Sequence, residues 1–308
     1  MDIVFLGSAD FGIPALKRLL EAHTVRAVVS TPARPQGRGL KRKESPVAMF
    51  ARQQGVSAIF TPEDLRDRSF REALAQCDAD IFVVVAFRIL PAALFSLPPF
   101  GTINVHASLL PKYRGPAPIQ RAIEAGEQET GVTVFRIDEG VDTGGILLQK
   151  RVSIGQRETA AELYGRLSDC GADALLETLD GIKKCSLKPF PQDNTAASHA
   201  PKLSKGEAHI NWEKPAEAIY NKIRAFKPFP GTYTLLEGKR LGIEWAEPVE
   251  KESLSEAGAV IGVGDSFFDV RCLTGALRVL EVKPEGRKSM SVHDFLLGKK
   301  LKEGTRCT

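Results

Sequence analysis

The chain has 308 residues, 43% of them hydrophobic and 26% charged, with a formal net charge of +4, a composition typical of a globular protein with room for two domains. No apolar run reaches the roughly 18 residues that a membrane-spanning helix needs, and the apolar start lacks the flanks of a signal peptide, so we expect a cytoplasmic protein without a membrane partner. The five cysteines are scattered and form no Cys-x-x-Cys pair, which argues against a zinc site and a disulfide framework, and we expect no metal.

The first part of the chain predicts strands that alternate with helices. Short apolar runs predict strands at 2–7, 24–30, 56–60, 79–86 and 101–107. Helical spacing of apolar residues, together with Ser and Pro start signals and a closing Gly, predicts helices at 11–22, 45–55 and 63–76. This alternation indicates an α/β fold with a doubly wound, mainly parallel, Rossmann-like sheet.

The remainder of the chain predicts a change of architecture. Two runs at 131–137 and 146–154 are expected to form a hairpin, and a helix over 158–182 then completes a first domain at 1–188. The polar, proline-containing stretch 189–206 shows no periodicity, which is typical of a linker. Short strand-like runs separated by Gly-rich turns, with one helix near 215–226, predict a small OB-like antiparallel β-barrel at 207–308.

The candidate catalytic residues lie at the end of the strand at 101–107. Asn104 and His106 are two residues apart, so their side chains share one face of the strand. Ligands of parallel sheets bind beyond this end of the strands. A carboxylate beside the histidine would favour its charged form, and Asp142 in "GVDTGG" is the expected partner. Together the three groups could stabilise an oxyanion at an attacked carbonyl and move protons.

Two motifs carry a resemblance to a known family. "NVHASLLPKYRGPAPIQRAI", followed by "ETGVTVFRIDEGVDTGGIL", resembles the signature of the folate-dependent formyltransferases in order and spacing, and supporting stretches extend the resemblance over nearly the full length. The resemblance implies transfer of a formyl group from 10-formyltetrahydrofolate as cosubstrate, by direct attack of an amine. Asn104 and His106 would then bind the formyl oxygen, and Asp142 would orient His106 and help remove the proton of the amine.

The same resemblance implies a folate-binding set on two loops. One loop follows the strand at 101–107, and the other is "FRILP" at 87–91. The set comprises Phe87, Arg88, Ile89, Leu90, Ser108, Leu109, Leu110 and Pro111. Apolar side chains can form the wall of a flat pterin ring, and backbone groups can bind its polar edge. Phe87-Arg88 replaces the family's usual Tyr-Gly, which leaves the role of Arg88 open, and the family also suggests a cis bond before Pro111.

A basic insert after the second strand points to a polyanionic partner. Thr31 to Glu44 is longer than the 2–6 residues common for such connections, and it carries five basic residues against one acid. The resemblance implies that this insert contacts initiator methionyl-tRNA, the amine-bearing substrate. The expected contacts are Arg34, Arg38, Lys41, Arg42 and Lys43. No obligate protein partner is evident, and a monomer is expected.

Three alternatives share these residues. One is a related formyltransferase that acts on a small amine, and another is a hydrolase that cleaves the formylated folate. A third is a protein that binds tRNA without catalysis. The basic insert argues against a small substrate, and the intact Asn104, His106 and Asp142 argue against a binding protein without activity.

Overall fold

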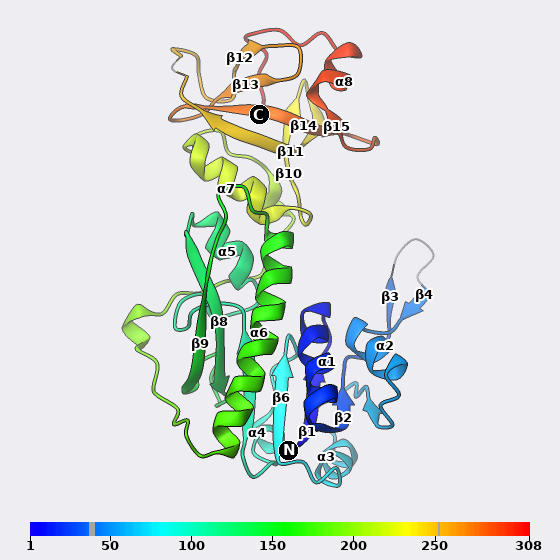
Figure 1. The fold of residues 1–308 in the computed structure, drawn as a ribbon. Coiled ribbons are helices and arrows are strands. Elements are labelled where there is room, and N and C mark those ends of the chain that lie inside the picture. The colour runs from blue at the N-terminus through cyan, green and yellow to red at the C-terminus, as the bar shows by residue number, and fades with distance from the viewer. Residues whose placement is uncertain (37–40, 252) are drawn as a thin grey trace. The chain divides into compact units, whose positions relative to one another are not determined.

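The computed structural model of the protein describes residues 1–36, 41–251 and 253–308 (Figure 1). The described chain forms two compact units. Unit 1 comprises Met1–Pro118, Glu129–Ser153 and Tyr164–Ala200, and unit 2 comprises Ile119–Gln128, Ile154–Leu163 and Pro201–Thr308. Residues 189–200, which the sequence predicts as part of a linker, thus lie in unit 1, and two segments from within 1–188 lie in unit 2.

Unit 1 is built on a seven-stranded sheet with the strand order β5-β2-β1-β6-β7-β8-β9. The strands are β1 (Asp2–Gly7), β2 (Thr24–Val29), β5 (Ile59–Phe60), β6 (Ile81–Val85), β7 (Thr102–His106), β8 (Glu129–Arg136) and β9 (Ile146–Ser153). The first five are parallel, and β8 and β9 continue the sheet in antiparallel pairing. Central strands such as β6 are buried along their whole length, because helices cover both faces of the sheet.

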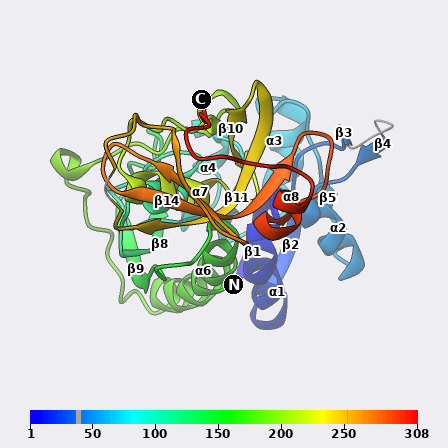
Figure 2. The ribbon, with the colours of Figure 1, turned by 90° about the horizontal axis from the view of Figure 1, so that it is seen from above.

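Helices flank the sheet of unit 1 on both sides. They are α1 (Ile13–Ala22), α2 (Pro46–Gln53), α3 (Arg68–Ala75), α4 (Ala92–Phe95) and the long α6 (Ala160–Lys183), with short 3-10 turns at Asp10–Gly12 and Asn194–Ala196. Figures 1 and 2 show α1 and α6 on one face and α3 and α4 on the other. The predicted helix at 63–76 was too long at its start. The Asp67 carboxylate accepts a hydrogen bond from Phe70 N and caps the helix, which therefore begins at Arg68, five residues later than predicted.

The basic insert contains a short antiparallel hairpin, where the sequence predicts a loop. Strand β3 (Arg34–Gln36) pairs with β4 (Lys41–Lys43), with Arg34 opposite Lys43. Both ribbon views place this hairpin beside α2, at the opposite end of unit 1 from β9 (Figures 1 and 2). These strands show no alternation of apolar and polar residues, and Arg34, Pro35, Arg42 and Lys43 are exposed.

Residues 190–200, which include the 3-10 turn at Asn194–Ala196, run across the loops that follow β7 and β8. Phe190 exchanges two backbone hydrogen bonds with Ile146, at 2.8 and 3.0 Å. Further along, Arg114 N donates to Ser198 O at 2.9 Å, and Ala200 N donates to Arg114 O at 2.7 Å. Isolated backbone bridges of this kind need no apolar periodicity, so a polar sequence can form them without resembling a strand.

Unit 2 holds a second sheet, which is antiparallel, in the order β10-β11-β14-β13-β12, with β15 paired to β14. Its strands are β10 (Thr232–Leu236), β11 (Lys239–Val249), β12 (Val260–Val263), β13 (Phe268–Arg271), β14 (Ala276–Pro284) and β15 (Met290–Ser291). Its helices are α5 (Pro118–Glu124), α7 (Ala216–Phe226) and α8 (Val292–Leu297), with a 3-10 turn at Gly206–Ala208. The predicted fold class, a doubly wound α/β domain followed by an antiparallel sheet domain, is confirmed.

The last residues of the chain connect the two edges of this antiparallel sheet. Leu235 of β10 exchanges backbone hydrogen bonds with Thr308 at 2.7 and 2.9 Å, and Val260 of β12 donates to Thr305 O at 2.8 Å. The end of the chain is therefore part of the sheet domain. A core that includes Trp212, Ile243 and Phe268 fills the interior beneath these strands.

Candidate active site

His106 is the last residue of β7 and lies where three parallel strands end together. The neighbouring strand β6 pairs with β7 up to Val105, and β1 pairs with β6 up to Gly7. On its other side, His106 lies opposite Thr133 of β8. The imidazole is only 7% exposed. The sheet therefore holds this side chain rigidly at its carboxyl edge, where the sequence predicts a ligand to bind.

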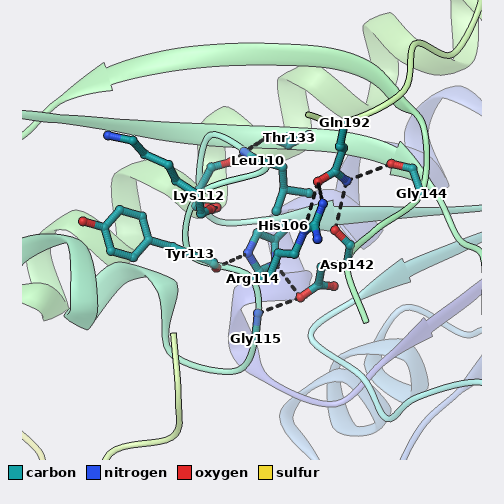
Figure 3. A network of polar contacts seen from close by, with 11 residues as sticks. His106, Leu110, Lys112, Tyr113, Arg114, Gly115, Thr133, Asp142, Gly144 and Gln192 are labelled. Atoms are coloured by element: carbon teal, nitrogen blue, oxygen red, sulfur yellow. Dashed lines mark hydrogen bonds and ion pairs between the residues drawn. The ribbon is translucent and has the colours of Figure 1, made fainter. Parts of the chain in front are cut away.

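Both ring nitrogens of His106 face oxygen atoms (Figure 3). Nε2 lies 2.8 Å from the backbone oxygen of Tyr113, and Nδ1 lies 3.6 Å from Oδ2 of Asp142. A carbonyl oxygen can only accept, so Nε2 carries a proton. The Asp142 carboxylate is close enough for charge attraction but beyond ordinary hydrogen-bond length, which leaves Nδ1 available to another oxygen.

Asp142 is held in an unusual backbone conformation in the turn between β8 and β9. Its φ is +56°, in the left-handed region that costs most side chains energy, although aspartate tolerates it better than most. Gly115 N donates to Oδ2 of Asp142 at 2.8 Å. This bond joins the turn to the loop that carries Tyr113, so both partners of His106 belong to one connected structure. The predicted pairing of Asp142 with His106 agrees with this geometry.

A partly buried network that the sequence did not predict supports the same turn. Gln192 Nε2 donates to the backbone oxygens of Asp142 at 2.9 Å and of Gly144 at 2.8 Å. Its Oε1 accepts from Nε and Nη2 of Arg114, at 3.1 and 2.7 Å. Arg114 also donates to Asn194 and is only 7% exposed. Nothing in the local sequence distinguishes Gln192 from other polar residues of the predicted linker, so sequence reasoning missed it.

Asn104 occupies β7 two residues before His106, as predicted. Its Oδ1 is buried and has no hydrogen-bond partner among the residues that the structure describes. A buried acceptor without a partner is energetically costly unless a ligand supplies a donor. The atom therefore suits a bound group that carries an N–H, which both an amine substrate and a folate can offer.

The loop after β7 makes its own hydrogen bonds around Thr133. Thr133 Oγ1 donates to Ser108 O at 2.6 Å and accepts from Leu110 N at 3.1 Å and from Gln149 Nε2 at 2.9 Å. Leu110 is 3% exposed and packs in a small core cluster, whereas Leu109 is half-buried. The bond between Leu110 and Pro111 is cis, as the family resemblance suggests.

Some side chains of the loop at 87–91 are buried in the core, and others are exposed. Leu90 is buried in the core cluster beneath α3 and α4, and Phe87 packs against that cluster, whereas Ile89 is 76% exposed. Arg88 donates to the backbone oxygens of Glu63 and Pro62, at 3.1 and 2.8 Å. Burial and the nearby charge of Arg34 lower the pKa of Arg88 from its ordinary value. Arg88 thus ties this loop to the segment before α3.

The predicted RNA contacts fall mainly on the β3–β4 hairpin. Arg34, Arg42 and Lys43 are exposed there, and Arg42 Nε donates to Ala33 O at 3.3 Å. Lys41 takes part in the backbone pairing. Arg38 lies outside the described residues. The hairpin therefore presents at least three cationic side chains together, an arrangement suited to a phosphate backbone.

None of the helices at 1–36, 41–251 or 253–308 combines the length and the apolarity that crossing a membrane requires. Within the same ranges, no group of three or more His, Cys, Asp or Glu side chains is arranged to hold a metal ion.

Comparison with solved structures places the fold. The chain resembles an N-formyltransferase from Helicobacter canadensis, solved with folinic acid and dTDP-3-aminofucose, with a TM-score of 0.67 and 22% identity over 90% of this chain and 98% of that one. It also resembles HypX from Aquifex aeolicus, solved with tetrahydrofolic acid, with a TM-score of 0.63 and 19% identity over 98% of this chain and 50% of that one. At this identity the likeness establishes the fold alone.

Comparison of sequences is more specific. The family model for formyl transferase matches residues 1–179, and the model for formyl transferase, C-terminal domain, matches residues 202–300. A methionyl-tRNA formyltransferase from Caldanaerobacter subterraneus is 42% identical, over 99% of each chain. Another, from Moorella thermoacetica, is 42% identical over 97% of this chain and 96% of its own. The chain therefore belongs to the family of methionyl-tRNA formyltransferases, enzymes that pair a formyl transferase domain with the family's C-terminal domain.

Proposed function

We propose that the protein transfers the formyl group of 10-formyltetrahydrofolate to the free α-amine of initiator methionyl-tRNA, for translation initiation in the cytoplasm. The observation that carries the proposal is the placement of His106, with Nε2 bound to a backbone carbonyl and Nδ1 facing the carboxylate of Asp142 at 3.6 Å. The names of the sequence relatives supply the acceptor, and the folate ligands of the structural neighbours support the donor.

His106 would act on the oxyanion. Attack of the amine on the formyl carbon turns the formyl oxygen into an anion, which needs hydrogen-bond donors fixed in advance. The Tyr113 carbonyl holds the ring through Nε2, so Nδ1 is the nitrogen that can donate to this oxygen. The Asp142 carboxylate stabilises the charged ring without occupying Nδ1 at hydrogen-bond distance.

The proton balance assigns a second role to Asp142. The amine must attack as the neutral base, and its nitrogen then carries a proton that it must lose as the new C–N bond forms. The Asp142 carboxylate would accept this proton, directly or through a water molecule. A proton returns to N10 of the folate as the bond between N10 and the formyl carbon breaks, so no net proton is gained. Direct transfer needs no protein nucleophile.

The folate would bind between the loops that follow β6 and β7. The folate supplies the formyl group and a good leaving nitrogen. Ile89 and Leu109 retain exposed apolar surface there, whereas Leu90 and Leu110 support the loops from the core. The unpartnered Oδ1 of Asn104 offers an acceptor to an incoming N–H. These residues fit a flat, partly apolar molecule with a polar edge.

The hairpin would bind the RNA. Arg34, Arg42 and Lys43 are exposed on β3 and β4, and their charges would contact phosphates of the acceptor end. Such contacts position the RNA without reading its sequence, and their strength falls as salt rises.

Formyl transfer to methionine-charged initiator tRNA tests the proposal. We expect wild type to be active. His106→Ala removes the imidazole and Asn104→Ala the side-chain amide N–H that would bind the formyl oxygen, so each should lower kcat about 100- to 1,000-fold, as for loss of an oxyanion donor. Formylation of a small amine, or hydrolysis of the folate with no transfer to the charged tRNA, would refute the assignment of the substrate. Retained activity in His106→Ala would refute the mechanism.

A further inference from the structure

Gln192 lies outside every set of residues expected from the sequence, yet its amide connects a buried arginine to the turn that carries Asp142 (Figure 3). We propose that Gln192 is a positioning residue for formyl transfer, which holds Asp142 beside His106 through the backbone of the 142–144 turn. The expected loss of formyl transfer rests on the proposed function, whereas the expected change in the position of Asp142 rests on the geometry alone.

The orientation of the Gln192 amide follows from its partners. Arg114 directs two N–H groups at Oε1, and a guanidinium can only donate, so this atom must be the amide oxygen. The amide nitrogen then faces the two backbone carbonyls, as their acceptor chemistry requires. Asn194 takes a further hydrogen bond from Arg114 at 2.8 Å, which fixes the guanidinium. Arg114 therefore donates to Gln192, and Gln192 donates to the turn.

The two carbonyls that Gln192 binds belong to Asp142 and Gly144, one on either side of Thr143. Asp142 has φ at +56°, a conformation that persists only where surrounding contacts hold it. Gly144 is crowded as well, since a Cβ there would lie 1.7 Å from the backbone oxygen of Arg136. The two N–H groups of the Gln192 amide bind the carbonyls on both sides of Thr143. Without them the turn would lose the bonds that keep Asp142 in this conformation.

The segment that carries Gln192 also supports the other partner of His106. Ser198 Oγ accepts from Tyr113 N at 2.9 Å, and Tyr113 O is the atom bound by His106 Nε2. The backbone pairing of Phe190 with Ile146 anchors the start of the segment. Residues 190–200 thus bind the backbone of both residues whose oxygens face the imidazole, Asp142 and Tyr113. Gln192 contacts the Asp142 turn through its amide nitrogen and the Arg114 loop through its amide oxygen, so the test must separate these two contacts.

Two substitutions at position 192 separate the loss of the donors from other effects. Gln192→Glu keeps an acceptor for Arg114 and puts an oxygen where the two carbonyls need a donor. Gln192→Met removes both donors and also the acceptor for Arg114, without adding charge, so loss of the donors is the change that the two variants share. We expect each to lower kcat roughly 10- to 100-fold, as for a small displacement of a catalytic group, with the KM values for folate and tRNA within about twofold of wild type. The control Gln76→Glu makes the same chemical change at an exposed position after α3 and should match wild type.

A double-mutant comparison tests whether Gln192 acts through Asp142. Asp142→Asn removes the carboxylate, so adding Gln192→Met to it should lower kcat less than about threefold further. A further loss as large as that of Gln192→Met alone would overturn the inference. Loss of kcat in Gln192→Glu but not in Gln192→Met would also overturn it, because the added charge and not the missing donors would then be responsible.

A measurement that needs no activity completes the test. The imidazole resonances of His106 can be assigned among the five histidines by comparison with His106→Gln. We expect Gln192→Met to change these resonances and Gln76→Glu to leave them unchanged. Unchanged His106 resonances in Gln192→Met would refute the positioning role, whatever the activity. Absence of formyl transfer in wild type would refute only the proposed function, since the resonances still report the position of Asp142.

Discussion

Thr133 offers a direct test of how the loop after β7 is held. It is fully buried, and its hydroxyl makes three hydrogen bonds, to Ser108 O, Leu110 N and Gln149 Nε2. Thr133→Val keeps the shape and removes all three. The Ser108 carbonyl and the Leu110 N–H then lose this partner, and burial prevents water from replacing it. At roughly 1–3 kcal/mol for each buried group left unpaired, we expect a loss of about 3 kcal/mol in the free energy of unfolding.

The control for this substitution is Thr133→Ser, which keeps the hydroxyl and removes one buried methyl group, at a cost of about 1 kcal/mol. Urea unfolding followed by circular dichroism reports on the helices, most of which lie in unit 1. The two tryptophans, Trp212 and Trp245, both lie in unit 2, so their fluorescence follows that unit separately. A loss for the Val variant no larger than that for the Ser variant would refute the reasoning.

Three further predictions concern other parts of the molecule. Asp269 is fully buried and binds Arg278 through both carboxylate oxygens. Asp269→Ala should therefore lower the free energy of unfolding by about 2–4 kcal/mol in urea titrations followed by fluorescence. A loss below about 1 kcal/mol would contradict this. The double variant Arg42→Glu, Lys43→Glu should lower kcat/KM for charged tRNA at least about 10-fold and weaken the dependence of this kcat/KM on salt. KM for folate should be unchanged. Equal losses of kcat/KM for tRNA and for folate would count against an RNA contact. Backbone and hydroxyl hydrogen bonds at the start of α6 lower the pKa of Glu162 from its ordinary 4.5, so its stabilising effect is present above that value and is lost as the pH falls through the lower folded value. Glu162→Gln should flatten the dependence of stability on pH below about 4.5, and an acid limb identical to that of wild type would show that Glu162 does not contribute.

The alternation of strands and helices in unit 1 could be predicted because strands buried on both faces of a sheet are continuous apolar runs in the sequence. The positions of Asn104 and His106 at a strand end followed from the same pattern. Spacing alone could not join Asp142 to them, since the turn that carries it lies beyond another strand. The glycine-flanked turn "GVDTGG" predicted Asp142 as the partner of His106, the family resemblance implied its role, and the 3.6 Å separation from His106 agrees with the pairing.

The features that the sequence did not predict depend on backbone atoms or on polar side chains without periodicity. The oxygen that binds His106 Nε2 is a main-chain carbonyl, and its residue type, Tyr113, gives no indication of this. Gln192 lies in a polar stretch with the composition of a linker, and single backbone bridges hold that stretch in place. The β3–β4 pairing was not predicted for a related reason, because its exposed residues Arg34, Arg42 and Lys43 show no apolar periodicity.

The segment at 190–200 determines where the chain can be divided to make a separate catalytic domain or a chimera. A catalytic module that ended at residue 188 would include Asn104, His106 and Asp142 but would lack Gln192 and the 198–200 bridges. Chimeras that exchange the C-terminal portion among relatives should therefore place the crossover after Ala200, where unit 1 ends. A crossover at 188 would combine an active-site turn from one parent with a supporting segment from the other. Such chimeras would be functional only where the two parents share this polar network.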